Sequence, residues 1–303
     1  MKRLVSLVSA ITMILSFAPQ VMADNKENVA SRQTLSLGFY HSAVIKADGS
    51  LWTWGRNNKG QLGDGTYNDK CAPVNIMDDV VAIATSTERA QSAAIKTDGS
   101  LWTWGQNDGG QLGDGTYDDK CVPVKIMDNV VSMSLGSDHS AAIKTDGSLW
   151  TWGRNDEGQL GDGTYDDKCV PVKIMDDVVS VNLGDYYSSA IKTDGSLWTW
   201  GRNDEGQLGD GTYDNKCVPV NIMDNVVHVS IKSKSAAVKK DGSLWMWGDY
   251  GWETEGVNIV RQSTPKRMME DVRLVKVGSN HMLVIKTDGS LWAWGGTHSW
   301  TAR

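Results

Sequence analysis

The sequence lacks the excess of positive charge that a nucleic-acid-binding protein needs. Its 303 residues include 30 Lys and Arg against 37 Asp and Glu, which gives a formal net charge of -7. Phosphate backbones bind basic surfaces, so this composition argues against nucleic acid as a partner. After residue 23 there is also no apolar run of the roughly 20 residues that a membrane-spanning helix requires.

The first 23 residues have the three-part pattern of a secretory signal. Lys2 and Arg3 form a positive start, residues 4–17 are mostly apolar and uncharged, and residues 21–23 suit a signal peptidase. An uncleaved anchor is the alternative, although the apolar run is short for one. We expect a signal peptide over residues 1–23, a flexible lead-in over residues 24–33, and a secreted, periplasmic or cell-surface protein. Removing the signal changes the net charge from -7 to -9.

One eight-residue stretch, Asp-Gly-Ser-Leu-Trp-x-Trp-Gly, recurs along the rest of the chain. Its copies are separated by 47 to 50 residues and begin at Asp48, Asp98, Asp146, Asp194, Asp241 and Asp288. A period of this length is typical of repeat architectures in which each repeat is one supersecondary unit. The sequence therefore raises two questions, how many units there are and what surface they present.

Each repeat contains short strand-like segments and no helical pattern. In the third repeat these segments, separated by breaks, are residues 130–136, 139–144, 149–152 and 169–174. The Asp146-Gly147 pair predicts a hairpin turn, since the favoured hairpin turns need positive φ at their central residues. Pro171 cannot donate to a sheet ladder, so the fourth segment is predicted to be an edge strand.

A small antiparallel sheet of this kind cannot bury both of its faces alone. Trp150 and Trp152 share one face of the third strand, and the other copies repeat this pair. Radial packing would bury these faces between neighbours, which predicts an all-β fold, a β-propeller of about six four-stranded blades over residues 34–303. A linear β-solenoid is the alternative, but its repeats are usually shorter. We expect the paired Trp residues to be core residues and not a sugar-stacking surface.

The last two repeats depart from the pattern. Copies one to four continue with a Gly-Gln-Leu-Gly segment, which is missing after the fifth copy, where an additional Trp252 appears. No Pro-containing fourth segment follows the sixth copy. We therefore expect an incomplete last blade. Four outcomes stay open. The ring could close with six blades, of which the last has fewer strands, or it could remain open. Alternatively, another chain could complete it, or Trp300 and the tail could cover the gap.

Four elements of the repeat carry a family resemblance. They are Gly-x-x-His-Ser, Asp-Gly-x-x-x-x-Trp-Gly, Asn-x-x-Gly-Gln-Leu-Gly and a later Pro, seen in the third repeat at residues 136–140, 146–153, 155–161 and 171. Over residues 34–295 the chain resembles the regulator of chromosome condensation repeat family. The resemblance implies a propeller, usually of seven blades. The family includes exported bacterial propellers, among them an inhibitor of β-lactamases, and a nuclear guanine-nucleotide exchange factor.

No residue pattern predicts catalysis, a metal or another cofactor. His41, His139 and His281 share one slot of the repeat, and no local catalytic motif surrounds them, so we expect structural hydrogen bonding. The Asp-rich loops do not match a calcium-binding loop, and tight turns explain most of their Asx residues. Calcium stays the alternative. We expect free thiols rather than disulfides, because equivalent points of adjacent blades should exceed the ~7 Å limit for a bridge, at Cys71, Cys121, Cys169 and Cys217.

We expect an exported, non-catalytic monomer that binds a protein partner through the loops of one face. It would contact a membrane only if the signal stays uncleaved. One alternative is a protein resembling a guanine-nucleotide exchange factor, which the export signal and the acidic charge disfavour. Another is a multivalent carbohydrate-binding lectin, since repeated identical loops suit weak multivalent binding better than a single active site.

Binding residues are expected where the repeats differ, because folding explains where they agree. Most of these positions lie in the turn between the first and second strands of a repeat, at one rim of the ring. Aromatic residues are favoured there because Trp and Tyr are frequent hot spots of protein interfaces. The predicted partner-binding residues are Phe39, Tyr40, Glu88, Arg89, Asp138, Tyr186, Tyr187, Tyr250, Trp252 and Trp300.

Overall fold

A computed structural model describes residues 34–232, 234–249, 252–254, 257–259, 261–279 and 281–295 of the chain. The secondary structure of these residues consists of strands β1 to β25. Within these ranges there is no helix that is long and apolar enough to cross a membrane. The strands form six antiparallel sheets, which we call blades 1 to 6 in chain order, and one small hairpin.

The strands of each blade pair in the order in which they occur along the chain. Blade 1 contains β1 (Leu35–Leu37), β2 (His41–Ile45), β3 (Leu51–Gly55) and β4 (Lys70–Met77). Blade 2 contains β5 (Val80–Thr85), β6 (Gln91–Lys96), β7 (Leu101–Gly105) and β8 (Lys120–Met127). Blade 3 contains β9 (Val130–Leu135), β10 (His139–Lys144), β11 (Leu149–Gly153) and β12 (Lys168–Met175).

The later blades follow the same plan with two changes. Blade 4 contains β13 (Val178–Leu183), β14 (Tyr187–Lys192), β15 (Leu197–Gly201) and β16 (Lys216–Met223). Blade 5 contains β17 (Val226–Ile231), β18 (Lys234–Lys239), β19 (Leu244–Gly248) and β22 (Gln262–Met269). The hairpin of β20 (Trp252–Thr254) and β21 (Val257–Ile259) is inserted before β22. Blade 6 contains β23 (Val272–Val277), β24 (His281–Lys286) and β25 (Leu291–Gly295).

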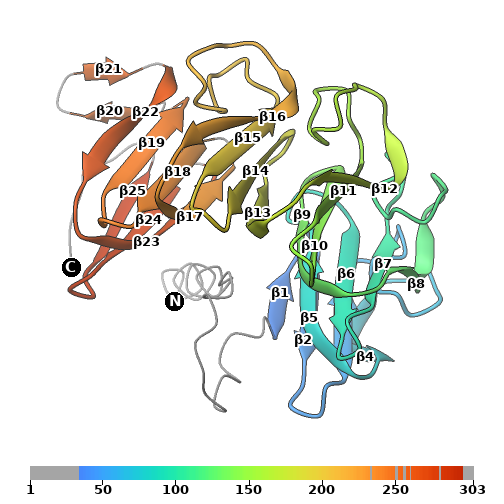
Figure 1. Cartoon of the computed structure of the whole chain (residues 1–303). Helices are drawn as coiled ribbons and strands as arrows, with labels where there is room; N and C mark the ends of the chain where they lie inside the picture. The colour runs from blue at the N-terminus through green and yellow to red at the C-terminus, as the bar shows by residue number, and fades with distance from the viewer. Residues whose placement is uncertain are drawn as a thin grey trace.

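The blades follow one another around an arc, with blade 1 and blade 6 at its two ends (Figure 1). This arrangement confirms the predicted all-β propeller of six blades with an incomplete last blade, and it excludes a linear solenoid. Five blades have four strands, and in the described residues the sixth has three. The Pro-containing strand of each complete blade is an edge strand, as Pro171 predicts.

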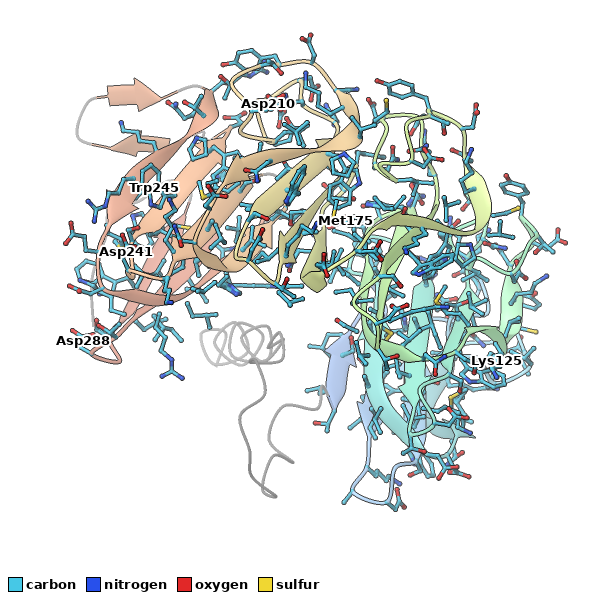
Figure 2. The ribbon with its side chains drawn as sticks, in the orientation of Figure 1. Lys125, Met175, Asp210, Asp241, Trp245 and Asp288 are labelled. Carbon is cyan, nitrogen blue, oxygen red and sulfur yellow. The ribbon has the colours of Figure 1, made fainter. Side chains whose placement is uncertain are left out.

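The hairpin turn of each repeat is built differently from the expectation. Gly147 has a φ of 79°, but Asp146 does not have positive φ, so only one central residue is left-handed. Asp146 instead stabilises the turn through its carboxylate, whose Oδ1 accepts hydrogen bonds from the Ser148 amide at 2.9 Å and hydroxyl at 2.6 Å. Ser148 Oγ in turn accepts from Trp150 Nε1 at 2.9 Å. The corresponding aspartates of blades 5 and 6, Asp241 and Asp288, are labelled in Figure 2.

Adjacent blades pack by placing the Leu-bearing face of one blade on the Trp-bearing face of the next. Leu51 of blade 1 shares a core cluster with Ile83 and Trp104 of blade 2. The second Trp of each pair is fully buried in blades 2 to 5, whereas the first is partly buried. Both members therefore belong to the packing between blades, the second as a fully buried residue and the first as a partly buried residue packed against the cluster.

The Gly-Gln-Leu-Gly segment covers the buried Trp of the following blade. Trp104 Nε1 donates to the backbone oxygen of Gln61 at 2.9 Å. Gly63 lies so close to this indole that a Cβ there would be 2.8 Å from Trp104 Nε1. The segment therefore has a structural role, and its repetition follows from the repetition of the Trp beneath it.

The Asp-rich loops are held together by hydrogen bonds within each loop. Asn155 Nδ2 donates to Asp162 Oδ1 at 3.1 Å and to the backbone oxygen of Asp166 at 3.1 Å. The Asn155 amide donates to Asp167 Oδ1 at 2.7 Å. Turn-building therefore accounts for these carboxylates. The four cysteines are free, as predicted.

Candidate functional site

The turns between the first and second strands of blades 1 to 5 lie at equivalent positions, and we call them the turn rim. Its described residues are 38–41, 86–91, 136–139, 184–187 and 231, 232 and 234. In blades 1 to 4 the residue after the third strand joins the turn, as the Arg154 amide does by donating to the Asp138 carbonyl at 2.9 Å. Seven of the ten predicted binding residues have described side chains, and all seven lie on this rim. Five of them are exposed or half-buried, and Asp138 and Tyr187 are buried.

Asp138 connects the rims of blades 2 and 3. Its Oδ2 accepts from Arg89 Nη2 at 2.9 Å, and Arg154 Nη1 lies 3.8 Å away. The carboxylate is almost fully buried. Burial raises the pKa of Asp138, and the positive charge of Arg89 opposes that rise. The fold therefore brings together two predicted residues, Arg89 and Asp138, and also Arg154, which the differences between repeats did not indicate.

Glu88 and Lys232 form an ion pair between blades 2 and 5. The Lys232 ammonium also donates to Thr87 Oγ1 at 3.3 Å. These blades are not neighbours in the arc, so the two turns approach one another across the rim. Lys232 was not predicted, because it lies 144 residues from Glu88 and belongs to no motif.

Exposed aromatic side chains lie on the same rim. Phe39 and Tyr40 are 54% and 56% exposed, and their ring centroids are 4.1 Å apart. The Arg56 guanidinium lies 5.3 Å from the Tyr40 ring. Such pairs of rigid aromatic rings can supply apolar contact area to a partner at low cost in conformational entropy.

Tyr186 lies between two arginines of blades 3 and 4. The guanidinium carbons of Arg154 and Arg202 are 5.8 and 6.0 Å from its ring centroid. Each arginine is also paired with an aspartate of its own loop, Asp156 at 2.5 Å and Asp204 at 2.6 Å. The ring is therefore held in place by cation–π contacts while it stays half-buried.

Tyr187 does not belong to the accessible surface, which corrects its assignment as a binding residue. Its side chain is buried, and its hydroxyl donates to the Lys234 carbonyl and lies 3.2 Å from Ser235 Oγ. Burial raises the pKa of Tyr187. Tyr187 fills the position that His139 fills in the preceding blade, and this equivalence could have indicated its structural role from the sequence.

The shared histidine slot connects each of blades 1 to 4 to the next blade. His41 Nε2 lies 2.9 Å from Ser92 Oγ, and His139 Nε2 lies 3.1 Å from Ser188 Oγ. In the intervening blade Gln91 Nε2 donates to the equivalent serine at 2.8 Å. Burial lowers the pKa of His41 to about 4 and that of His139 to about 3, so both rings are neutral at neutral pH. This geometry agrees with a structural role for the slot.

Three predicted residues cannot be placed at the rim. Tyr250 and Trp300 lie outside the described residues. Trp252 begins β20, and the position of its side chain is also outside what is described. Their proposed part in binding stays a prediction.

Six sheets of one repeated plan, packed face to face around an arc, define a β-propeller. A family model described as the regulator of chromosome condensation (RCC1) repeat matches residues 48–88, 98–143, 146–191 and 194–234. A second RCC1 repeat model matches residues 33–61, 130–159, 178–207 and 272–298. The chain belongs to the RCC1 repeat family.

Solved structures show the same fold. Human WBSCR16 has a TM-score of 0.74 at 20% identity, covering 91% of this chain and 78% of that one. Yeast RCC1 (Prp20), solved with Kap60, has a TM-score of 0.71 at 20% identity, covering 89% and 71%. Prp20p from Saccharomyces cerevisiae has a TM-score of 0.67 at 22% identity, covering 89% and 73%. No curated protein matches the sequence.

Proposed function

We propose that this protein is a non-catalytic binding propeller that docks a protein partner on its turn rim. The observation that carries the proposal is the placement of Phe39, Tyr40 and Tyr186. Phe39 and Tyr40 are exposed and Tyr186 is half-buried, and the rings of Tyr40 and Tyr186 lie beside arginines of the same rim. Aromatic and Arg side chains are the most frequent hot spots of protein interfaces.

The relatives support a protein as the partner. One similar structure is yeast RCC1 bound to Kap60, and another is described with its binding to Gsp1p and histones. At this level of identity the particular partners do not transfer to this chain. The secretory pattern of residues 1–23 favours a partner outside the cytoplasm.

The proposal is tested by removing the exposed rings without disturbing the rim. Two variants, Phe39→Ala combined with Tyr40→Ala, and Tyr186→Ala, should reduce recovery of the partner in an affinity pull-down from the native surroundings. Tyr165→Ala is the control, because Tyr165 is 51% exposed, close to Phe39 and Tyr40, and lies on the loop between β11 and β12, away from the turns that form the rim. Full recovery with both rim variants, or an equal loss with the control, would show that the rim is not the docking surface.

A further inference from the structure

The free edge of β25 is the feature that the proposed function leaves unused. In blades 1 to 5 the third strand is paired on both sides, by the second strand and by the Pro-containing fourth strand. Among the residues that the structure describes, β25 is paired with β24 alone. Within the described part of the chain, one row of its backbone hydrogen-bonding groups therefore has no strand beside it, and such an edge is a template for another strand.

The first residue of β25 is also more exposed than its counterparts in the other blades. The Leu that begins the third strand is fully buried in blades 1 to 5, as Leu51 and Leu149 are, but Leu291 is 45% exposed. In the complete blades this Leu pairs with the Met that ends the fourth strand, for example Leu149 with Met175. The Met and the Ile before it pack against the core cluster of the blade interface.

Blade 1 does not cover this face. If the ring closed directly, Leu291 would be buried against the Trp-bearing face of blade 1, as Leu51 is buried against Trp104. Instead Leu37, which lies on that face of blade 1, is 38% exposed. Trp54 also has no backbone acceptor among the described residues, whereas Trp104 donates to Gln61. The two end faces of the arc therefore do not meet.

We propose that the edge of β25 binds an extended, proline-containing strand of a partner polypeptide by β-strand addition. The complete blades define the chemistry of this strand, because their third strands have the same sequence pattern as β25. Their fourth strands are eight residues long, with Pro at the fourth position and Met at the eighth, and have the bounds Lys70–Met77, Lys120–Met127, Lys168–Met175, Lys216–Met223 and Gln262–Met269. Backbone hydrogen bonds supply affinity in this binding mode, and pockets for alternate side chains supply specificity.

The pairings in the complete blades also predict the register of the bound strand. Gly153 is paired with Lys168 and Leu149 with Met175, so the last position of the partner strand lies opposite Leu291. An apolar side chain is required there to cover that Leu. The first position is less selective, because Lys168 is replaced by Gln262 in blade 5 and the strand still pairs. The partner strand is therefore specified by its apolar C-terminal end, and the Pro is the further feature that the five fourth strands share.

The test uses a synthetic peptide of residues 166–177 carrying Cys169→Ser and a fluorescent label, titrated with the purified protein. Saturable binding by fluorescence anisotropy is expected, and a peptide of scrambled order should not bind. Leu291→Lys places a charge opposite the Met and should weaken binding at least tenfold. Val131→Lys is the matched control, since Val131 is 54% exposed on β9, and it should bind like the unchanged protein.

Hydrogen exchange distinguishes a vacant edge from one that the chain already occupies. Alternate amides of Leu291–Gly295 should exchange faster than those of Leu244–Gly248 in the free protein, and the peptide should slow them. Three results would overturn the proposal: no saturable binding, equal binding by the Leu291→Lys variant, or β25 amides as protected as those of β19 before the peptide is added. In the last case the strand would come from the chain itself.

Discussion

Glu88 of the β5–β6 turn and Lys232 of the β17–β18 turn form an ion pair, although two other blades lie between theirs along the arc. The pair joins parts of the chain that no blade-to-blade interface joins. Its contribution to stability is small, since Glu88 is 40% exposed and exposed ion pairs contribute about 0 to 1 kcal/mol. It therefore links two turns of the rim without adding much to stability.

Glu88→Gln should lower the free energy of unfolding by no more than about 1 kcal/mol. The Lys232 ammonium keeps its hydrogen bond to Thr87, and salt screens the lost attraction. The measurement is urea unfolding of both proteins at low salt and at 1 M NaCl, where the difference should vanish. A loss of several kcal/mol that persists in salt would mean that the pair holds the arc together.

Trp152→Ala should lower the free energy of unfolding by about 3 to 5 kcal/mol, because it opens a cavity between blades 2 and 3. It also leaves the Gln111 carbonyl without the indole donor that it has at 2.9 Å. Trp150→Ala is the comparison, since Trp150 is only partly buried and should cost less. Denaturant midpoints for the two variants measure the difference, and an equal or reversed order would contradict the packing described above.

The fold was predictable from the sequence because its signals are local. Alternation with a period of two and the Asp-Gly pair placed the third strand at residues 149–152, and the structure has Leu149–Gly153. Repetition then extended one correct assignment to the other blades. The sequence did not show which Trp of each pair is fully buried, because both share a face and the difference depends on the loop of the preceding blade.

The candidate site was less predictable because its contacts are not local. Arg89 and Asp138 were both predicted, but their pairing depends on adjacent turns meeting at the rim. Lys232 carries no motif, and only the curvature of the arc brings it to Glu88. Tyr187 was assigned to the surface because it differs from the residues at the same position of the other repeats, although this position is buried.

Gly161→Ala should destabilise the protein more than Gly163→Ala. Both glycines have positive φ, 77° and 84°, so each substitution carries the cost of a left-handed residue, about 1 to 2 kcal/mol. A Cβ at Gly161 would lie 2.7 Å from Trp200 Nε1, whereas at Gly163 the nearest atom is 3.8 Å away. The difference in the free energy of unfolding therefore isolates the packing of the loop on the Trp. Equal losses would show that the loop moves aside without cost.

His139 should make the protein less stable as the pH falls below about 6.5. Burial lowers its pKa to about 3 in the folded state, against 6.5 when unfolded. Between these values the unfolded chain binds the proton and the folded chain does not, so stability is fully present above pH 6.5 and is lost as the pH falls. His41, with a pKa of about 4, acts in the same direction.

The pKa values of Asp138 and Asp185 are raised in the folded protein, so these residues increase its stability as the pH falls, the opposite of the histidines. This effect is confined to the pH range in which carboxylates titrate. The range from pH 7 to pH 5 therefore reports mainly on the histidines. His139→Gln is the informative variant, because Gln91 occupies the same slot in blade 2 and donates to Ser140 at 2.8 Å. It should keep the link to Ser188 while removing the titrating group. Urea unfolding at pH 7, 6 and 5 should give a shallower loss of stability for this variant, and an unchanged slope would mean that the ring is protonated within the folded protein.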